Sequence, residues 1–134
     1  MPGNFFDSNI LLYTASSDAA KAARAEALIA DGGTISIQVL NEITNVARRK
    51  MQLDWRETHL LLDTVRSLLD VIPLTIGIHE SGLTIAERYT LSIYDAMIAA
   101  AALEGGCETL WSEDMQHGAL INDRVRILDP FRQG

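Results

Sequence analysis

Short apolar segments alternate along the chain with longer segments in which apolar residues recur every three or four positions. The short segments are rich in β-branched and aromatic residues and are bounded by Gly, Pro, Asn or Asp, as strands are. Five strands are predicted: the segment that ends at Asp7, then 34–37, 71–74, 109–111 and 125–128. Pro73 lacks an N–H for the ladder, so its strand is expected at a sheet edge or a strand end.

The longer segments carry the apolar stripe of amphipathic helices. Six helices are predicted: one that begins at Ser8 or Asn9, then about 19–30, 38–50, 55–70, 78–89 and 96–103. Ser17-Asp18 is the expected N-cap of the 19–30 helix, and Asp54 that of the 55–70 helix. Strands and helices alternate without a hairpin signal, which indicates a parallel sheet covered on both faces. We therefore expect a three-layer α/β/α fold with a mostly parallel central sheet of four or five strands. The length of 134 residues suits a single domain of residues 1–134.

Four carboxylates lie where predicted strands end or helices begin. Asp7 ends the first strand, Glu42 lies one turn into its helix, Asp95 opens the 96–103 helix, and Asp114 follows the 109–111 strand. Right-handed crossovers place the carboxyl ends of parallel strands at one edge of the sheet, where ligands bind in such folds. We therefore expect the four carboxylates to converge there.

Each acid also has a purely structural interpretation. Glu42 can complement the dipole of its helix, Asp95 can complete a capping box with Ser92, and Asp114 can bond its own backbone in a turn. Against the capping interpretation, Asp95 shares a helical stripe with Ala99 and Ala102, whose small side chains let this face lie against the sheet. The local patterns leave both interpretations open for each acid.

Converging carboxylates repel one another unless a cation neutralises them. Mg²⁺, with Mn²⁺ as a substitute, prefers oxygen ligands and binds through a few carboxylates together with water and substrate phosphate. Such a site can activate water against a phosphodiester. The pattern of acids therefore predicts metal-assisted phosphodiester hydrolysis.

The net charge of −7 opposes passive binding to a polyanion, so nucleic acid would need a local basic patch. Arg48, Arg49 and Lys50 are the candidates, although the same three residues also suit the C-terminus of an exposed helix. Cys107 is the only cysteine and excludes an internal disulfide, which favours a cytoplasmic protein. No apolar run approaches the roughly 18 residues of a membrane span, and the N-terminus lacks the pattern of a signal peptide.

Other sites are disfavoured. The chain has no phosphate-binding Gly-rich motif, and its three histidines lack metal-ligand spacing. A response-regulator receiver domain needs a lysine after its last strand, but only Lys21 and Lys50 are present. A haloacid-dehalogenase phosphatase needs an Asp two positions after the first, where this chain has Asn9.

Taken together, these residues resemble a known family, the PIN-domain ribonucleases, in particular the VapC-type toxins of bacterial toxin–antitoxin pairs. The resemblance covers essentially the whole chain. It rests on D-S-N at 7–9, Q-V-L-N-E at 38–42, Y-D-A-M-I-A-A-A at 94–101 and S-E-D-M-Q-H-G at 112–118.

The resemblance implies a catalytic and metal-binding set of Asp7, Glu42, Asp95 and Asp114. It further implies supporting roles for Asn9 and Ser112, and a less certain one for Glu113, where many relatives have no acid. It also implies Mg²⁺-dependent cleavage of RNA, tRNA among the candidates, a homodimer, and inhibition by a cognate antitoxin. The alternative is a catalytically idle PIN-like domain that serves as a protein-binding module.

Overall fold

A computed structural model describes residues 3–132; residues 1, 2, 133 and 134, the outermost of the predicted domain, lie outside the described part. The strands are β1 (Asn4–Phe6), β2 (Thr34–Ser36), β3 (Asp70–Ile72), β4 (Thr109–Trp111), β5 (Leu120–Ile121) and β6 (Val125–Leu128). The helices are α1 (Ser8–Tyr13), α2 (Ala19–Ala30), α3 (Ile37–Arg49), α4 (Trp55–Leu68), α5 (Ile76–Tyr89) and α6 (Ile93–Glu104).

The strands form one sheet in the order β3-β2-β1-β4-β6-β5, in which every pair is parallel except β5 with β6. The mostly parallel sheet is confirmed, but it has six strands where four or five were expected. The added strand β5 pairs with β6 through a turn closed by the Arg124 N–H and the Ile121 carbonyl, 3.0 Å apart. Asn122 and Asp123 adopt φ of 50° and 58° in this turn. Asn and Asp tolerate that conformation, so the hairpin forms without the glycine that usually signals one.

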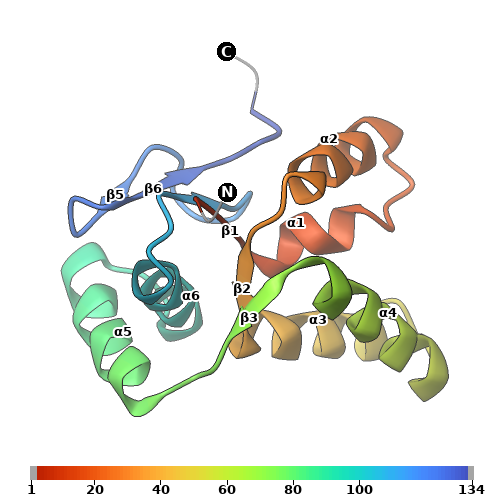
Figure 1. Ribbon diagram of the computed structural model, residues 1–134, viewed down its shortest axis with the longest axis horizontal. Coiled ribbons are helices and arrows are strands. Elements are labelled where there is room, and N and C mark those ends of the chain that lie inside the picture. The colour runs from red at the N-terminus through yellow and green to blue at the C-terminus, as the bar shows by residue number, and fades with distance from the viewer. Residues whose placement is uncertain (1–2, 133–134) are drawn as a thin grey trace.

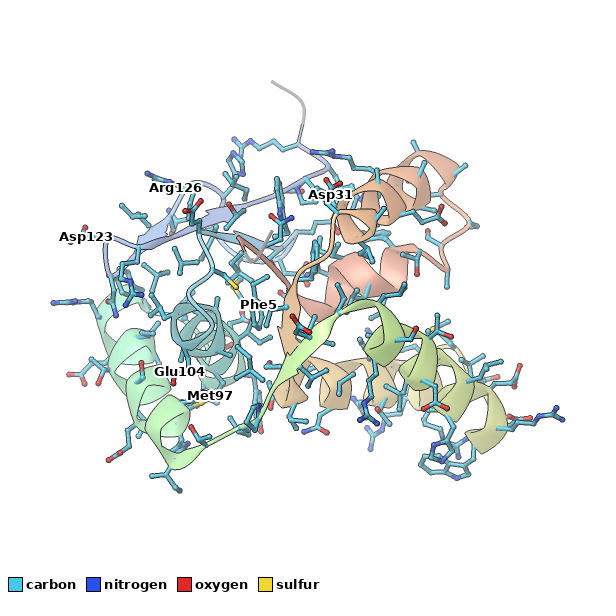
Figure 2. All side chains as sticks on the ribbon, in the orientation of Figure 1. Phe5, Asp31, Met97, Glu104, Asp123 and Arg126 are labelled. Carbon is cyan, nitrogen blue, oxygen red and sulfur yellow. The ribbon has the colours of Figure 1, made fainter. Side chains whose placement is uncertain are left out.

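Helices cover the sheet on both sides, which confirms the three-layer arrangement. In Figure 1, α5 and α6 lie together on one side of β2 and β3, while α1 to α4 lie on the other. Strand β1 is central, and its two phenylalanines are fully buried; Figure 2 shows Phe5 at the middle of the molecule. A Cβ added at Gly82 of α5 would lie 2.7 Å from Met97, so the glycine lets α5 lie close against α6.

The helix boundaries follow local capping. Asp18 caps α2 and Asp54 caps α4, both as predicted. Helix α6 begins three residues earlier than predicted because the Ser92 hydroxyl oxygen accepts the Asp95 N–H and starts the helix at Ile93. None of the helices in residues 3–132 is long and apolar enough to cross a membrane.

Candidate active site

Asp7 lies at the centre of the site, where β1 ends and α1 begins. Its backbone N–H donates to the Trp111 carbonyl at 3.0 Å, which ties it to the end of β4. Its side chain is only 3% exposed and accepts hydrogen bonds of 2.7 Å from both the Ser8 N–H and the Ser112 hydroxyl. The carboxylate is therefore fixed in a single orientation by groups from two strand ends.

Burial raises the pKa of Asp7 from 3.8 to about 6. The hydrogen bonds from Ser112 and Ser8 oppose this rise, while the charges of Glu42 and Asp95 add to it. The Asp7 carboxylate thus lies among negative charge that the described residues do not neutralise.

Glu42 lies in the second turn of α3 and is partly buried on the side of Asp7. Its Oε1 accepts a 2.8 Å hydrogen bond from the Ser8 hydroxyl, and its Oε2 accepts one of 3.1 Å from Gln38. Because α3 begins at Ile37 and has no acid in its first turn, the helix-dipole interpretation of Glu42 loses its basis. Ser8 instead links the carboxylates of Asp7 and Glu42.

Asp95 lies in the first turn of α6 and is partly buried, while Ala99 and Ala102 of the same stripe are fully buried. Burial raises the pKa of Asp95, and the charge of Asp114 adds to the rise although the Ser92 hydroxyl opposes it. Ser92 does cap the helix at the Asp95 N–H, so the capping geometry and the inward placement occur together.

Asp114 is exposed and reaches the site through Asn9. The side-chain N–H₂ of Asn9 donates to Asp114 Oδ2 at 3.1 Å and to Asp7 Oδ2 at 3.3 Å. The carboxylate of Glu113 accepts hydrogen bonds from Lys21 and Tyr13, and the backbone N–H of Glu113 donates to the side-chain amide oxygen of Asn9 at 3.2 Å. Asn9 and Ser112 therefore contact the acids directly, whereas Glu113 reaches them only through Asn9.

The tertiary structure adds two residues that pattern reasoning missed, Ser8 and Gln38. Ser8 directly follows Asp7, and Gln38 lies four residues before Glu42 on the same helix, so both could have been found by asking what holds each acid. Within residues 3–132, no three Asp, Glu, His or Cys side chains approach closely enough to form a complete metal centre by themselves.

A cavity of about 390 Å³ adjoins the acids between α1, the loop after β4 and the end of α3. Asn9, Glu113 and Asp114 line one part of it, and Val46 and Met51 line another. A larger cavity of about 560 Å³ between α3 and α4 is lined by none of the four acids, so the candidate site is not at the larger of these two cavities.

The three residues of the predicted basic patch do not share one environment in the structure. Arg48 donates to the Leu53 carbonyl at 2.7 Å and lies over the Trp55 ring at 4.2 Å from its centroid, so it holds the α3–α4 connection. Arg49 and Lys50 are exposed at the end of α3. Arg49 lies seven residues after Glu42, and two turns of a helix return it to the same face.

Comparison with protein families gives a match over residues 5–120 to the PIN domain. The chain belongs to the PIN-domain family. This confirms the resemblance stated from the sequence. PIN-domain homologues of the VapC type are nucleases, and PIN nucleases generally use divalent metal ions.

Solved structures with the same fold include a toxin–antitoxin complex and a toxin. A toxin–antitoxin complex from Klebsiella pneumoniae matches with a TM-score of 0.72 and 24% identity, covering 97% of this chain and 99% of that one. A DNA-bound VapBC complex from Salmonella typhimurium matches with a TM-score of 0.73 and 20% identity, over 97% and 99%. VapC20 of Mycobacterium tuberculosis, a toxin that cleaves the sarcin–ricin loop, matches with a TM-score of 0.67 and 18% identity, over 83% and 91%. The search of curated proteins finds no significant match.

Proposed function

We propose that this PIN domain, as a single domain of residues 1–134, is a Mg²⁺- or Mn²⁺-dependent endoribonuclease and the toxin of a toxin–antitoxin pair. The observation that carries the proposal is the buried Asp7 carboxylate, whose pKa is raised to about 6 among other acids while serines hold it in place. A purely structural Asp would be expected beside a cation or outside the negative cluster.

The donors present suit a hard divalent cation. All four acids offer oxygen ligands, and the described residues place no lysine or arginine against Asp7 to neutralise it. Mg²⁺ needs only one or two carboxylates with water and phosphate, so the absence of a preformed three-residue centre in residues 3–132 is compatible with it. Asp7, Glu42, Asp95 and Asp114 would supply the oxygens from which the ion takes its ligands. Ser8, Asn9 and Ser112 would orient the ligands from outside.

Bound there, the metal ion would lower the pKa of a water and stabilise charge on the reacting phosphate. The residues of the chain would orient the carboxylates, accept the proton and bind the RNA. Ser112 and Ser8 keep the Asp7 oxygens in one orientation. Glu42, held by Ser8 and Gln38, would accept a proton from the attacking water. Arg49 and Lys50 would contact RNA phosphates along the end of α3.

We further propose a cytoplasmic homodimer that is inhibited by a cognate antitoxin, with no role for a membrane. The fold shared with toxin–antitoxin complexes supports the antitoxin partner. The cationic character expected of that antitoxin follows from the acidic site, because the planar guanidinium of Arg pairs with carboxylates two N–H groups at a time.

The test is to compare wild type with Asp95→Asn on total cellular RNA, mapping the cleaved ends with and without Mg²⁺ or Mn²⁺. We expect Mg²⁺-dependent cleavage at discrete sites and a loss of at least about 100-fold in the variant, with the fold retained. Asp63→Asn, which removes the same charge from the exposed face of α4, is the matched control and should keep full activity. Cleavage that persists in EDTA, or in Asp95→Asn, would refute the proposal.

The rival function is a catalytically idle PIN-like domain that binds a protein partner. The observation that favours it is the absence, among residues 3–132, of three acids close enough to hold a metal by themselves. Titration with Mn²⁺ separates the two functions, because an idle domain should bind the ion no more tightly than Asp95→Asn does.

A further inference from the structure

Lys21 of α2 is held against the loop that follows β4. Its Nζ lies 2.6 Å from Glu113 Oε2 and 3.2 Å from the Tyr13 hydroxyl, which itself donates to Glu113 Oε1. The ammonium also lies 4.7 Å from the Tyr13 ring centroid and 5.1 Å from that of Phe131. Residues from four segments of the chain thus meet at one lysine, and we call Lys21, Tyr13, Glu113 and Phe131 the lysine anchor.

The lysine anchor makes more contacts than an ordinary surface ion pair does. The two charged side chains are only 32% and 25% exposed. The Tyr13 and Phe131 rings, which both lie beside the Lys21 ammonium, pack edge to face against each other with their centroids 4.7 Å apart. This is also the one salt bridge in residues 3–132, although the chain has eleven lysines and arginines and a net charge of −7. A partly desolvated, three-way hydrogen-bonded pair restrains both side chains far better than an exposed pair does.

The restraint passes to the acids through the backbone of Glu113. This N–H donates to Oδ1, the side-chain amide oxygen of Asn9, at 3.2 Å. An amide side chain accepts at its oxygen and donates at its nitrogen, so this bond determines that the Asn9 N–H₂ faces the carboxylates. The N–H₂ then bridges Asp7 Oδ2 and Asp114 Oδ2.

We infer that Lys21 and Glu113 are positioning residues, which fix the loop after β4 so that Asn9 holds Asp7 and Asp114 in place for the metal ion. The inference rests on the proposed function, because it concerns the same acids. Lys21 has no role in contacting the metal or the scissile phosphate in this arrangement, since its ammonium is engaged by Glu113, Tyr13 and the aromatic faces.

Two variants separate positioning from simple electrostatics. Lys21→Met keeps the aliphatic stem and removes the charge, and Glu113→Gln removes the opposite charge with little change of shape. If the pair acted only through its field, Lys21→Met would tighten binding of Mn²⁺ and Glu113→Gln would weaken it. If the pair positions the loop, both variants should weaken Mn²⁺ binding by about tenfold, the lower end of the range for residues that orient metal ligands.

The decisive measurement is isothermal titration of Mn²⁺ into wild type, both single variants and the double variant. Positioning predicts that the double variant binds no more weakly than either single variant, because each change breaks the same pair. Lys21→Arg should restore affinity to within about threefold of wild type, since it keeps the positive charge and the donors. Arg124→Met removes one positive charge from the exposed β5–β6 turn and should leave the affinity unchanged.

A second readout needs no metal at all. The side-chain N–H₂ signals of Asn9 in a ¹H–¹⁵N spectrum should shift in Lys21→Met and in Glu113→Gln, and stay in place in Arg124→Met. If Lys21→Met does not fold, Tyr13→Phe can replace it, because it removes only the hydroxyl. Tyr13→Phe should also shift the Asn9 signals. Unchanged Asn9 signals, or Mn²⁺ binding in Lys21→Met as tight as in wild type, would overturn the inference. Failure of wild type to bind Mn²⁺ would instead refute the proposed function, leaving the Asn9 signals to decide the anchor.

Discussion

Replacing Asp7 with Asn should make the metal-free protein more stable at neutral pH while abolishing metal binding. The two effects have one origin, because the carboxylate that would hold the metal is costly to bury when the metal is removed. Its side chain is 3% exposed, and its pKa is raised to about 6 by burial and by the charge of Glu42. Asn keeps the size and one acceptor oxygen but cannot ionise.

The magnitude follows from the pKa. Between pH 3.8 and about 6 the folded protein keeps a proton on Asp7 that the unfolded chain has released, so the free energy of unfolding falls as pH rises through this window. Above it, the ionised carboxylate costs the metal-free protein about 3 kcal/mol. The Asp7→Asn variant would avoid that cost but would weaken the hydrogen bonds from Ser8 and Ser112, a loss of about 1–2 kcal/mol.

The net gain is therefore about 1–2 kcal/mol at pH 7.5. At about 2.1 cal/mol/K of unfolding entropy per residue, this corresponds to a rise in Tm of about 4–7 °C for a chain of this length. At pH 4 Asp7 is protonated in the folded protein, so the gain should vanish. Saturating Mn²⁺ should reverse the order, because only wild type gains the roughly 3 kcal/mol that binding at about 100 times Kd supplies.

Thermal unfolding followed by circular dichroism at pH 4 and 7.5, in EDTA and in excess Mn²⁺, measures all four conditions. Asp63→Asn is the control, since it removes an exposed carboxylate from α4 and should change little in any of them. A Tm of Asp7→Asn below that of wild type at pH 7.5 in EDTA would show that the Asp7 carboxylate stabilises the fold, contrary to its raised pKa.

Three further outcomes test the partners proposed for the protein. Replacing Arg49 and Lys50 with Gln should weaken RNA binding, measured by fluorescence anisotropy, without changing the affinity for Mn²⁺. The slope of log K against log [salt] should fall by about 0.7 for each phosphate that is no longer neutralised, and an unchanged slope would show that the RNA binds elsewhere. An Arg-containing antitoxin segment should compete with the metal for the acids, so raising Mg²⁺ should weaken inhibition of RNA cleavage, and inhibition that ignores Mg²⁺ would mean that the antitoxin binds away from them. Sedimentation equilibrium should show a dimer of twice 14.7 kDa at micromolar concentration, and the 14.7 kDa species alone would contradict it. Leu60→Gln should weaken the dimer, because Leu60 is 67% exposed on α4.

The sequence predicts that the dimer uses the helices around Leu28-Ile29 and over residues 60–69, because these carry the most aliphatic side chains. The structure buries Leu28 and Ile29 in the core of the chain itself, so they leave little surface for a partner. Leu60 and Leu68 of α4 remain exposed. An apolar stripe shows that a helix face is covered, but only the packing of the other elements shows by what.

What the sequence alone determined is local. The alternation of strands and helices, the caps at Asp18 and Asp54, and the placement of Asp7 at a strand end all depend on residues within four or five positions of one another. Periodicity and capping act over that range, so they can be inferred without knowledge of the fold. Motif resemblance then predicted the four acids as the site, and for Asp95 the helical stripe shared with Ala99 and Ala102 already weighed against an ordinary capping role.

What only the tertiary structure decided is which groups hold those acids. Ser112 reaches Asp7 across 105 positions, and Asn9 reaches Asp114 across the same span. Both contacts exist because β1 pairs with β4, a choice of neighbour that side-chain periodicity does not encode. The same pairing brings Glu113 to Lys21, 92 positions away. Local interactions place each carboxylate at the end of its own element, but long-range strand order and the packing of α1 and α2 determine the charge and hydrogen bonds around it.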